Sequence, residues 1–495
     1  MNARSPLALP SPGPTARAHR SFRRWLPKWA RVRMRWLRTV CSAPSAATSS
    51  RSVMRPQISF ADLPGRRVGI YGLGTEGKAN VRACLALGVE PVLVADTAPQ
   101  TEDPELDGRA VLAFSSGALL GCDTVIKSPG ISRYSAGVRE LEAAGVQVVG
   151  GLGLWLQDAD RSKVVVITGT KGKSTTTAIT GHLLERLGYR CLIGGNIGVP
   201  PWDPALPSGD VDFWVIEASS YQATDLSCSP AVVAVTSLHP DHLPWHAGDP
   251  ELYYRDKLSA AAQPGAQLTV ANGDSDLIAA RQQLLGPRVQ WIHADDDPDA
   301  HWMDGLGLLG AHNRRNALIA RACLVALGVP EASDDELLAA AAQGFAGLDS
   351  RLKVVGVING VTFIDDNLST NVLPTLAAVD SFPAQRVALI VGGQSRGIEY
   401  GSLATGLRAR TEKLLMLTVP DNGTAIRAQV EAVGAGDQVE IVDTAGLRAA
   451  VRAGYEWVGP GGVVLLSPAA PSFGIFRDYK ERGEVFVAAM HEITG

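Results

Sequence analysis

The residues best suited to chemistry in this sequence lie in one run, KVVVITGTKGKSTTT, from Lys163 to Thr177. The β-branched residues 164–167 predict a buried strand, and the apolar spacing after the glycines predicts a helix. Backbone N–H groups of a glycine turn at a helix N-terminus bind phosphate oxygens. Lys173 offers an ammonium group to the β- and γ-phosphates, and the Ser174 hydroxyl is a potential Mg²⁺ ligand. The run therefore predicts a polyphosphate site with Mg²⁺.

The spacing of this loop differs from that of the common phosphate loop. That pattern places a glycine five residues before the Gly-Lys pair, where this chain has Ile167. The alternative is a glycine turn that only starts a helix, but the strand before it and the helix after it favour phosphate binding. The predicted loop residues are Gly169, Thr170, Lys171, Gly172, Lys173, Ser174 and Thr175.

Length and composition limit the class of protein. A chain of 495 residues is too long for one ordinary core, so we expect about two to four domains. The formal net charge of −4 argues against a general nucleic-acid binder. The six cysteines are scattered without a C-x-x-C pair, which favours reduced thiols in a cytoplasmic protein over disulfides or a zinc site. No apolar run is long enough for stable membrane insertion.

Residues 1–55 differ from the rest, because they contain many arginines and no Asp or Glu. The tryptophans among these arginines make a basic amphipathic helix on an anionic membrane conceivable. A signal peptide fits poorly, since no uninterrupted apolar segment follows the charges. The Ser/Pro/Ala-rich flanks favour a disordered extension, or translation that starts at Met34 or Met54.

The segment 56–150 predicts a small doubly wound domain. A strand at 68–71 runs into the G-x-G-x-x-G turn from Gly72 to Gly77, and the next strand ends at Asp96, about twenty residues on. This combination is the dinucleotide fingerprint, although such turns bind many phosphorylated ligands. The loop 128–131 follows another strand and is expected at the ligand-binding edge of the same sheet.

The segment 151–347 carries several polar residues near the phosphate loop. Glu217 ends a strand, which is where a Mg²⁺ ligand is expected beside such a loop. His239, His242 and His246 suggest zinc, but they have no cysteine partner, so a Mg²⁺ or substrate-positioning role for His242 is favoured. Asn196 lies in a predicted loop, 194–198, as a ligand donor or a turn cap. Asn313 and Asn316 share a helical face and are suited to contacts with a base or to capping.

The segment from about Leu348 to the C-terminus predicts a third α/β unit. Strands are expected at 362–365, 387–391 and 463–466, and each runs into a polar loop. The three loops are expected at one edge of one sheet, facing a common site.

From about residue 56 to its end, the sequence resembles the Mur ligases, the ATP-dependent amide-forming enzymes of peptidoglycan precursor synthesis. The motifs that carry the resemblance are TGTKGKST, GGNIG, EASS, PDHL, YYRDK, GAHNRRNA, the position of Arg351 and the terminal LLSPAAPSFGIFRDYKERG. Within the family, the sequence is similar to members that add glutamate to UDP-N-acetylmuramoyl-L-alanine.

The resemblance implies an α/β fold of three domains: a Rossmann-like UDP-sugar domain (56–150), a P-loop ATPase domain with a mostly parallel sheet (151–347) and a Rossmann-like amino-acid-binding domain (348–495). It also implies ATP and Mg²⁺ as cofactors. The residues implied to bind the UDP-sugar are Gly74, Thr75, Asp96 and Thr97, with Asn196 at the muramoyl-alanine arm. Those implied for ATP are the loop residues with Asn316, Arg351 and Asp366. The implied catalytic residues are Lys173, Lys257 and His242, and the implied metal ligands are Ser174, Glu217, His242 and a carbamylated Lys257. The implied amino-acid pocket contains Thr370, Arg396, Ser472, Phe473 and Tyr479.

Departures from the family pattern gather in that amino-acid pocket. Asn367 to Thr370 replace a common Ser-Lys-Ala-Thr, Arg396 replaces a lysine and Tyr479 replaces a phenylalanine. A bidentate guanidinium changes how a carboxylate must lie. We therefore favour L-glutamate, with a separate epimerase acting on the product, over the alternative of D-glutamate.

Three other functions are weighed against this one. An NAD-dependent oxidoreductase would use the turn at Gly72 but leaves GTKGKST unexplained. A folate-polyglutamating ligase would lack the nucleotide-sugar domain in front. A non-catalytic ATP-binding switch would need the phosphate loop but neither Lys257 nor Asp366.

Overall fold

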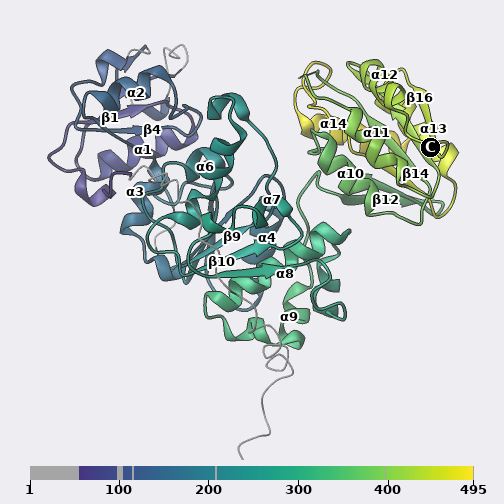
Figure 1. Ribbon diagram of the computed structural model, residues 1–495, viewed down its shortest axis with the longest axis horizontal. Coiled ribbons are helices and arrows are strands. Elements are labelled where there is room, and N and C mark those ends of the chain that lie inside the picture. Colours follow the sequence, from purple (N-terminus) through teal and green to yellow (C-terminus); the bar gives the residue numbers. More distant parts are fainter. Residues whose placement is uncertain are drawn as a thin grey trace, which may run out of the picture. The chain divides into compact units, whose positions relative to one another are not determined.

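The computed structural model describes residues 55–96, 104–106, 108–113, 116–206, 209–395 and 397–493. Within these ranges the chain is an α/β protein with three sheets, and the predicted fold class is confirmed (Figure 1). Residues 1–54 of the basic extension, Thr97 and Arg396 lie outside the described residues. No helix in the described ranges has the length and apolar character that a membrane span requires.

The first sheet has five parallel strands in the order β3-β2-β1-β4-β5. The strands are β1 (Val68–Tyr71), β2 (Val92–Val94), β3 (Val111–Leu112), β4 (Thr124–Lys127) and β5 (Gln147–Val149), and the helices are α1 (Thr75–Ala86) and α2 (Ala136–Ala143). The strand order reverses between β1 and β4, so the loops after these two strands flank the crevice where such sheets bind ligands.

The second sheet has six parallel strands in the order β11-β10-β9-β6-β8-β7. The strands are β6 (Val164–Thr168), β7 (Cys191–Gly195), β8 (Phe213–Glu217), β9 (Val232–Val235), β10 (Leu268–Asn272) and β11 (Val289–Ile292). The helices are α3 (Gly151–Asp158), α4 (Lys173–Arg186), α5 (Ser220–Ala223), α6 (Pro250–Ala262), α7 (Asp276–Ala279), α8 (Ala311–Ala326) and α9 (Asp335–Ala342).

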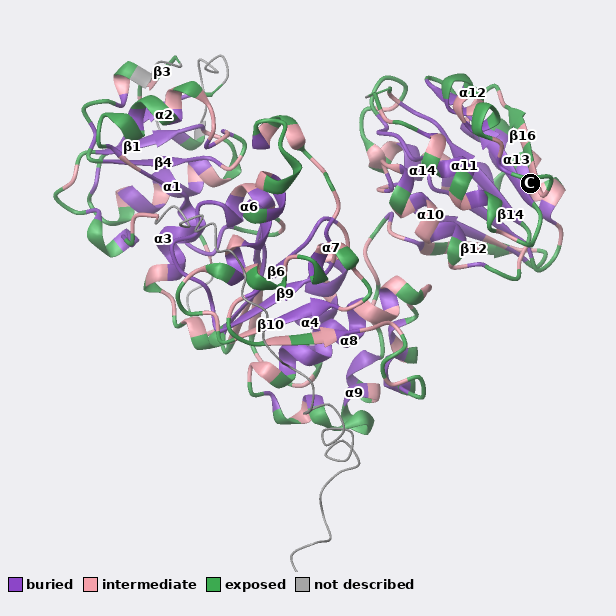
Figure 2. Ribbon diagram, in the orientation of Figure 1, coloured by how far each residue is buried: buried purple, intermediate pink, exposed green. Residues whose placement is uncertain are grey.

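Both faces of this sheet are covered, which explains the β-branched run of β6. Val164 and Val166 pack in one core with α6, whereas Val165 and Ile167 pack in another with α4 and α8. All five residues of β6 are buried (Figure 2). A strand between two helical layers has no polar face, so its carboxyl end is where polar residues can appear.

The third sheet has the order β12-β13-β17-β14-β15-β16, with β12 antiparallel to β13 and the other pairs parallel. The strands are β12 (Lys353–Ile358), β13 (Val361–Asp365), β14 (Val387–Val391), β15 (Leu414–Thr418), β16 (Val439–Asp443) and β17 (Val463–Leu466). The helices are α10 (Val372–Asp380), α11 (Gly401–Arg408), α12 (Gly423–Val433), α13 (Leu447–Val458) and α14 (Tyr479–His491). Because β13, β17 and β14 are neighbours, the three predicted loops do share one sheet edge.

One local prediction was wrong. Gly194 and Gly195 are the last residues of β7 and pair with Ile216 and Glu217 of β8, so the loop begins only at Asn196. Gly195 has a φ of +93°, and a Cβ there would lie 2.3 Å from the Glu217 carbonyl oxygen. The glycines allow two strands to approach closely, which their sequence alone does not distinguish from a turn.

Candidate active site

The phosphate loop connects β6 to α4, and its glycines are needed for close packing. Gly169 has a φ of +142°, and a Cβ there would lie 2.2 Å from the Thr236 hydroxyl oxygen. Gly172, at φ +88°, is the N-cap of α4 and gives that helix no side-chain cap. The first turn of α4 contains no acidic residue. Its backbone N–H groups therefore form a site for an anion.

The loop is braced from behind by the end of β9. Thr236 Oγ1 donates to the Lys171 carbonyl oxygen at 2.6 Å, and the Lys171 N–H donates to Ser237 Oγ at 2.8 Å. The Thr170 N–H donates to the Ser237 carbonyl oxygen at 2.9 Å. These bonds fix the loop conformation, so the cost of ordering it is met by the fold before any phosphate binds.

Two lysines approach the loop from opposite directions. Lys173 Nζ donates to the Thr170 carbonyl oxygen at 3.2 Å, and burial lowers the pKa of Lys173 to about 8. Lys257, on α6, is 3% exposed, and its Nζ donates to the Gly169 carbonyl oxygen at 3.0 Å. Burial, followed by the charge of Lys173, lowers the pKa of Lys257 well below its ordinary value. The lowered pKa favours the uncharged form of the Lys257 amine, which is the nucleophilic form.

Glu217 lies at the end of β8, beside the loop, because Ile167 and Glu217 are paired residues of β6 and β8. The carboxyl is 1% exposed, and its Oε1 accepts from the Asn196 amide at 2.8 Å. Its Oε2 is buried without a hydrogen-bond partner. A buried carboxylate oxygen without a partner is costly unless a cation or a donor meets it. Glu217 therefore fits the role of a Mg²⁺ ligand.

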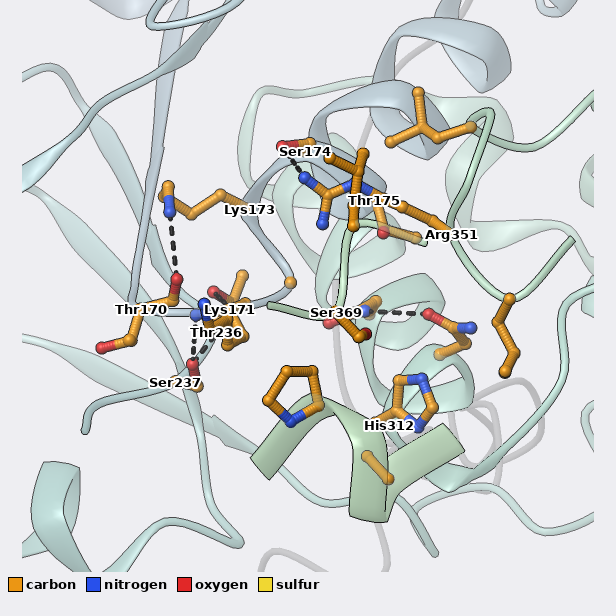
Figure 3. A pocket seen from close by; sticks show the side chains of 18 of the residues that line it. Thr170, Lys171, Lys173, Ser174, Thr175, Thr236, Ser237, His312, Arg351 and Ser369 are labelled. Atoms are coloured by element: carbon orange, nitrogen blue, oxygen red, sulfur yellow. Dashed lines mark hydrogen bonds between the residues drawn. The ribbon is translucent and has the colours of Figure 1, made fainter. Parts of the chain in front are cut away.

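Residues that follow α9 complete the site. Arg351 Nη2 donates to the Ser174 hydroxyl oxygen at 3.3 Å (Figure 3). Asp366, at the end of β13, is 7% exposed and accepts from the Leu352 N–H at 3.1 Å and from Ser467 Oγ at 2.6 Å. Burial raises the pKa of Asp366 to about 7 despite these bonds.

These groups line one cavity of about 430 Å³. Of the predicted residues, it brings together Thr170, Lys171, Gly172, Lys173, Ser174, Thr175, Asn196, Glu217, His242, Asn316, Arg351 and Asp366. Lys257 lies next to this lining, through its bond to Gly169. The loop and the C-terminal segment thus face one volume, which is large enough for a nucleotide.

The predicted UDP-sugar residues lie apart from this cavity, on the first sheet. Gly74, the N-cap of α1, and Thr75 are exposed at the carboxyl end of β1, and Asp96 is exposed after β2. A Cβ at Gly77 would lie 2.0 Å from the Gly72 carbonyl oxygen, so this turn requires a glycine there. The close approach of helix and strand is the geometry that the fingerprint predicts.

The predicted amino-acid residues surround the edge of the third sheet. Ser472 is 5% exposed, Phe473 is 48% exposed, and Thr370 and Tyr479 are half-buried. The Asn367 amide donates to the Tyr479 carbonyl oxygen, and the Asn367 side-chain oxygen accepts from the buried Arg482. The altered loop is therefore tied to the start of α14.

The three histidines of the 239–246 segment have separate surroundings. His246 is fully buried, with Nδ1 2.7 Å from Asp256 and Nε2 3.1 Å from Ser220. His242 is exposed, next to the Tyr221 ring, and His239 lines the cavity. Only His239 and His242 therefore face the site.

Sequence reasoning missed several lining residues, among them Thr236, Ser237 and His312. Thr236 and Ser237 follow β9, the neighbour of β6, and polar residues at the end of an adjacent strand are a usable signal. His312 starts α8, and burial lowers its pKa to about 4, so its ring is uncharged. A neutral ring here is suited to stacking on a base.

The sequence matches two family models. One, described as the Mur ligase middle domain, covers residues 167–303, and the other, described as the Mur ligase glutamate ligase domain, covers residues 350–470. A relative from Micromonospora sp., named UDP-N-acetylmuramoyl-L-alanine–L-glutamate ligase, is 38% identical over 88% of this chain and 99% of its own length. A relative of the same name from Xanthomonas oryzae pv. oryzae is 36% identical over 86% of this chain and 95% of its own length.

Among solved structures, the chain is similar to the MurF ligase of Thermotoga maritima in complex with ADP. The TM-score is 0.52 at 14% identity, over 86% of this chain and 95% of that chain. At this identity the similarity concerns the fold alone.

Proposed function

The chain belongs to the Mur ligase family of ATP-dependent amide-forming ligases, and from this premise we propose that it joins L-glutamate to UDP-N-acetylmuramoyl-L-alanine. The observation that carries the proposal is the shared name of relatives that match 86–88% of the chain at 35–38% identity. The altered loop at Asn367 to Thr370 agrees with a pocket that differs from that of the D-glutamate-adding members.

We assign the cavity to ATP. The amides of the phosphate loop with Lys173 would bind the β- and γ-phosphates, and Arg351 would exchange its Ser174 contact for phosphate oxygens. His312 and Asn316 would contact the base, and Asp366 would accept from the ribose hydroxyls. The remaining assignments place the UDP-sugar at Gly74, Thr75, Asp96 and Thr97, and glutamate at Thr370, Arg396, Ser472, Phe473 and Tyr479.

The donor set also fits Mg²⁺. The unpartnered Glu217 Oε2, the Ser174 hydroxyl and His242 would hold the ion, with Lys257 as a further ligand once it is carbamylated. Bound Mg²⁺ would supply charge neutralisation for the phosphate oxygens. Burial lowers the pKa of Lys257 and so favours the uncharged amine, the form that carbamylation requires.

A carboxylate does not form an amide directly, because the oxygen that would have to leave is a poor leaving group. The carboxylate is therefore first converted to an acyl phosphate. A carboxylate oxygen of the alanine attacks the γ-phosphorus, the bond to the bridging oxygen breaks, and ADP leaves. The uncharged amine of glutamate then attacks the carbonyl carbon of the acyl phosphate, phosphate leaves with the C–O electron pair, and the nitrogen loses its proton. Lys173 and Arg351 stabilise the negative charge that develops on the oxygens. Closure of the chain around the bound substrates would exclude water, which would otherwise hydrolyse the acyl phosphate.

We further propose a cytoplasmic enzyme of three domains, at 56–150, 151–347 and 348–495, because its substrates are intracellular nucleotide compounds. A product that contains L-glutamate would need a separate epimerase before it could enter a peptide with D-glutamate.

The test is incubation of the purified chain with UDP-N-acetylmuramoyl-L-alanine, ATP and Mg²⁺, together with either glutamate enantiomer. We expect phosphate release and a new amide product with L-glutamate, and at least tenfold slower turnover with D-glutamate. Turnover with D-glutamate alone would refute the L-specific proposal while leaving the ligase assignment in place.

A further inference from the structure

A buried carboxylate, Asp256, lies one residue before Lys257 on α6 and is surrounded by donors. It is 4% exposed, and the Tyr134 hydroxyl lies 2.7 and 2.8 Å from its two oxygens. Thr224 Oγ1 donates to it at 2.9 Å, and His246 Nδ1 lies 2.7 Å away. Because the carboxylate only accepts, each of these groups donates, and the desolvation cost of the charge is offset.

The donors come from separate parts of the chain. Tyr134 belongs to the segment 128–134, which follows β4 at the ligand-binding edge of the first sheet. Thr224 ends α5, and His246 ends the short helix η6 (Leu243–His246). Asp256 therefore joins the first sheet's loop to two segments and one helix of the second sheet's domain.

Further contacts hold the same loop in place. The Trp245 indole N–H donates to the Pro129 carbonyl oxygen at 3.1 Å, and the Ser132 hydroxyl donates to the Trp245 carbonyl oxygen at 2.5 Å. The Trp245 ring also packs edge-on against the Tyr134 ring, with centroids 6.0 Å apart. These contacts restrict the loop, and the Tyr134 hydroxyl links it directly to α6.

The same side of α6 also contacts the phosphate loop. The Tyr253 hydroxyl lies 2.8 Å from Thr170 Oγ1, and Lys257 Nζ donates to the Gly169 carbonyl oxygen at 3.0 Å. Tyr253, Asp256 and Lys257 share one face of the helix by their i, i+3 and i+4 spacing. One rigid helix thus contacts both the sugar-side loop and the phosphate loop.

We propose that Asp256 is a positioning residue that, through Tyr134, sets the distance between the UDP-sugar substrate held on the first sheet and the γ-phosphate on the phosphate loop. The inference rests on the proposed function. Phosphoryl transfer requires the two reacting atoms to meet in a near-attack geometry, and a displacement of about 1 Å can cost about a hundredfold in rate. Loss of the link would therefore slow the first chemical step without weakening ATP binding.

The test compares Tyr134→Phe with a matched control, Tyr189→Phe. Each change removes one tyrosine hydroxyl that donates to a carboxylate. The control loses the 2.9 Å bond from Tyr189 to Glu331, which involves neither the 128–134 loop nor α6. The measurement is the burst of ADP formed from UDP-N-acetylmuramoyl-L-alanine and ATP before glutamate is added, with the KM for ATP and the melting temperature. We expect a burst at least tenfold slower for Tyr134→Phe at an ATP KM within about twofold of wild type, and a burst within about twofold of wild type for Tyr189→Phe.

Asp256→Asn supplies a second variant. The amide keeps the side-chain volume but replaces one acceptor oxygen of the carboxylate by an NH₂ donor. The proposal is supported if the burst is also slowed in this variant while its ATP affinity stays at the wild-type value. A burst that is equal in Tyr134→Phe and Tyr189→Phe overturns it, as does a fall in activity that only follows a loss of folded protein. If the wild-type chain itself forms no ADP, the proposed function fails and this inference with it. Failure of the proposed function is thus seen in the wild-type chain, whereas failure of this inference is seen only in the variants.

Discussion

A buried group of charges between the first and second sheets provides a sharp test of the energetics. Asp225 lies 2.5 Å from Lys127 Nζ through one oxygen and 2.5 Å from Arg133 Nε through the other. The side chains of Lys127, Asp225 and Arg133 are 0%, 3% and 3% exposed. Replacing Asp225 by Asn leaves the buried Lys127 without its ion-pair partner and Arg133 with Glu142 alone, whereas Lys127→Met leaves Asp225 paired with Arg133. The two changes should therefore differ strongly in cost.

The magnitudes follow from the cost of uncompensated buried charge. Removing one partner of a buried pair typically costs about 3–5 kcal/mol, so we expect that range or more for Asp225→Asn. For Lys127→Met we expect at most about 2 kcal/mol, because an apolar side chain of similar volume replaces a desolvated ammonium. The assay is urea unfolding followed by tryptophan fluorescence, for which Trp245 is a local reporter, since its ring centre lies 5.5 Å from Lys127 Nζ. Because a chain of this size need not unfold in two states, local hydrogen exchange of β4 gives the second measurement.

The pH dependence of stability gives a further test of the Asp225 cluster. Burial alone would raise the pKa of Asp225, but the charges of Arg133 and Lys127 hold it below its ordinary value. Its contribution to stability is therefore complete above pH 4 or so and is lost as the pH falls through the lower, folded value. Asp225→Asn should abolish this part of the acid transition. Equal costs for Asp225→Asn and Lys127→Met would refute the reasoning, because they would mean that water compensates the stranded cations.

Three further predictions concern the sites. Lys257→Ala should lower the ligase rate to near zero, and short carboxylic acids should restore part of it, because they can replace the carboxylate of a carbamylated lysine; absence of any loss would favour a non-catalytic ATP-binding protein. Asp366 has a pKa raised to about 7, so it destabilises the folded chain increasingly as the pH rises from about 4 to 7. Asp366→Asn should therefore raise the melting temperature at pH 8, measured by calorimetry, and weaken ATP binding, measured by nucleotide titration. Unchanged ATP affinity would contradict the ribose assignment. Gly77→Ala should abolish UDP-sugar binding, because its Cβ would lie 2.0 Å from a carbonyl oxygen. Gly74→Ala should fold normally, because its Cβ would meet no atom within 4 Å. Equal effects of the two changes on the melting temperature would refute the packing argument.

The sequence predicts those parts of the fold that depend on local patterns. The strands at 68–71, 387–391 and 463–466 have the predicted bounds, because β-branched runs bounded by glycines or polar loops are typical of strands covered on both faces. The phosphate loop and the acid of β8 were likewise placed correctly beside each other, since parallel strands bring their carboxyl ends to one edge.

The interactions between sheets were not predictable in this way. The bonds of Asp256 to Tyr134 and Thr224 and of Asp225 to Arg133 join residues from 32 to 122 positions apart, and no local period encodes such pairs. Buried polar residues such as Asn367 and Arg482 look like surface residues in a hydropathy pattern, yet both are 1% exposed or less. Burial of polar groups is decided by which partners the tertiary fold supplies.

The charge arrangement of the cavity explains why its residues have shifted pKa values. Burial lowers the pKa values of Lys173 and Lys257, the positive charge of Lys173 adds to the shift at Lys257, and burial raises the pKa of Asp366. The pKa values of these three groups are thus shifted toward the neutral form in the absence of ligand, which is a cost to the folded chain. A bound polyphosphate would reverse the cost at Lys173, because the anion favours the ammonium. The same binding would stabilise the fold by mass action. Ligand binding therefore removes part of the electrostatic cost at this site. The free energy so gained contributes to the affinity for ATP.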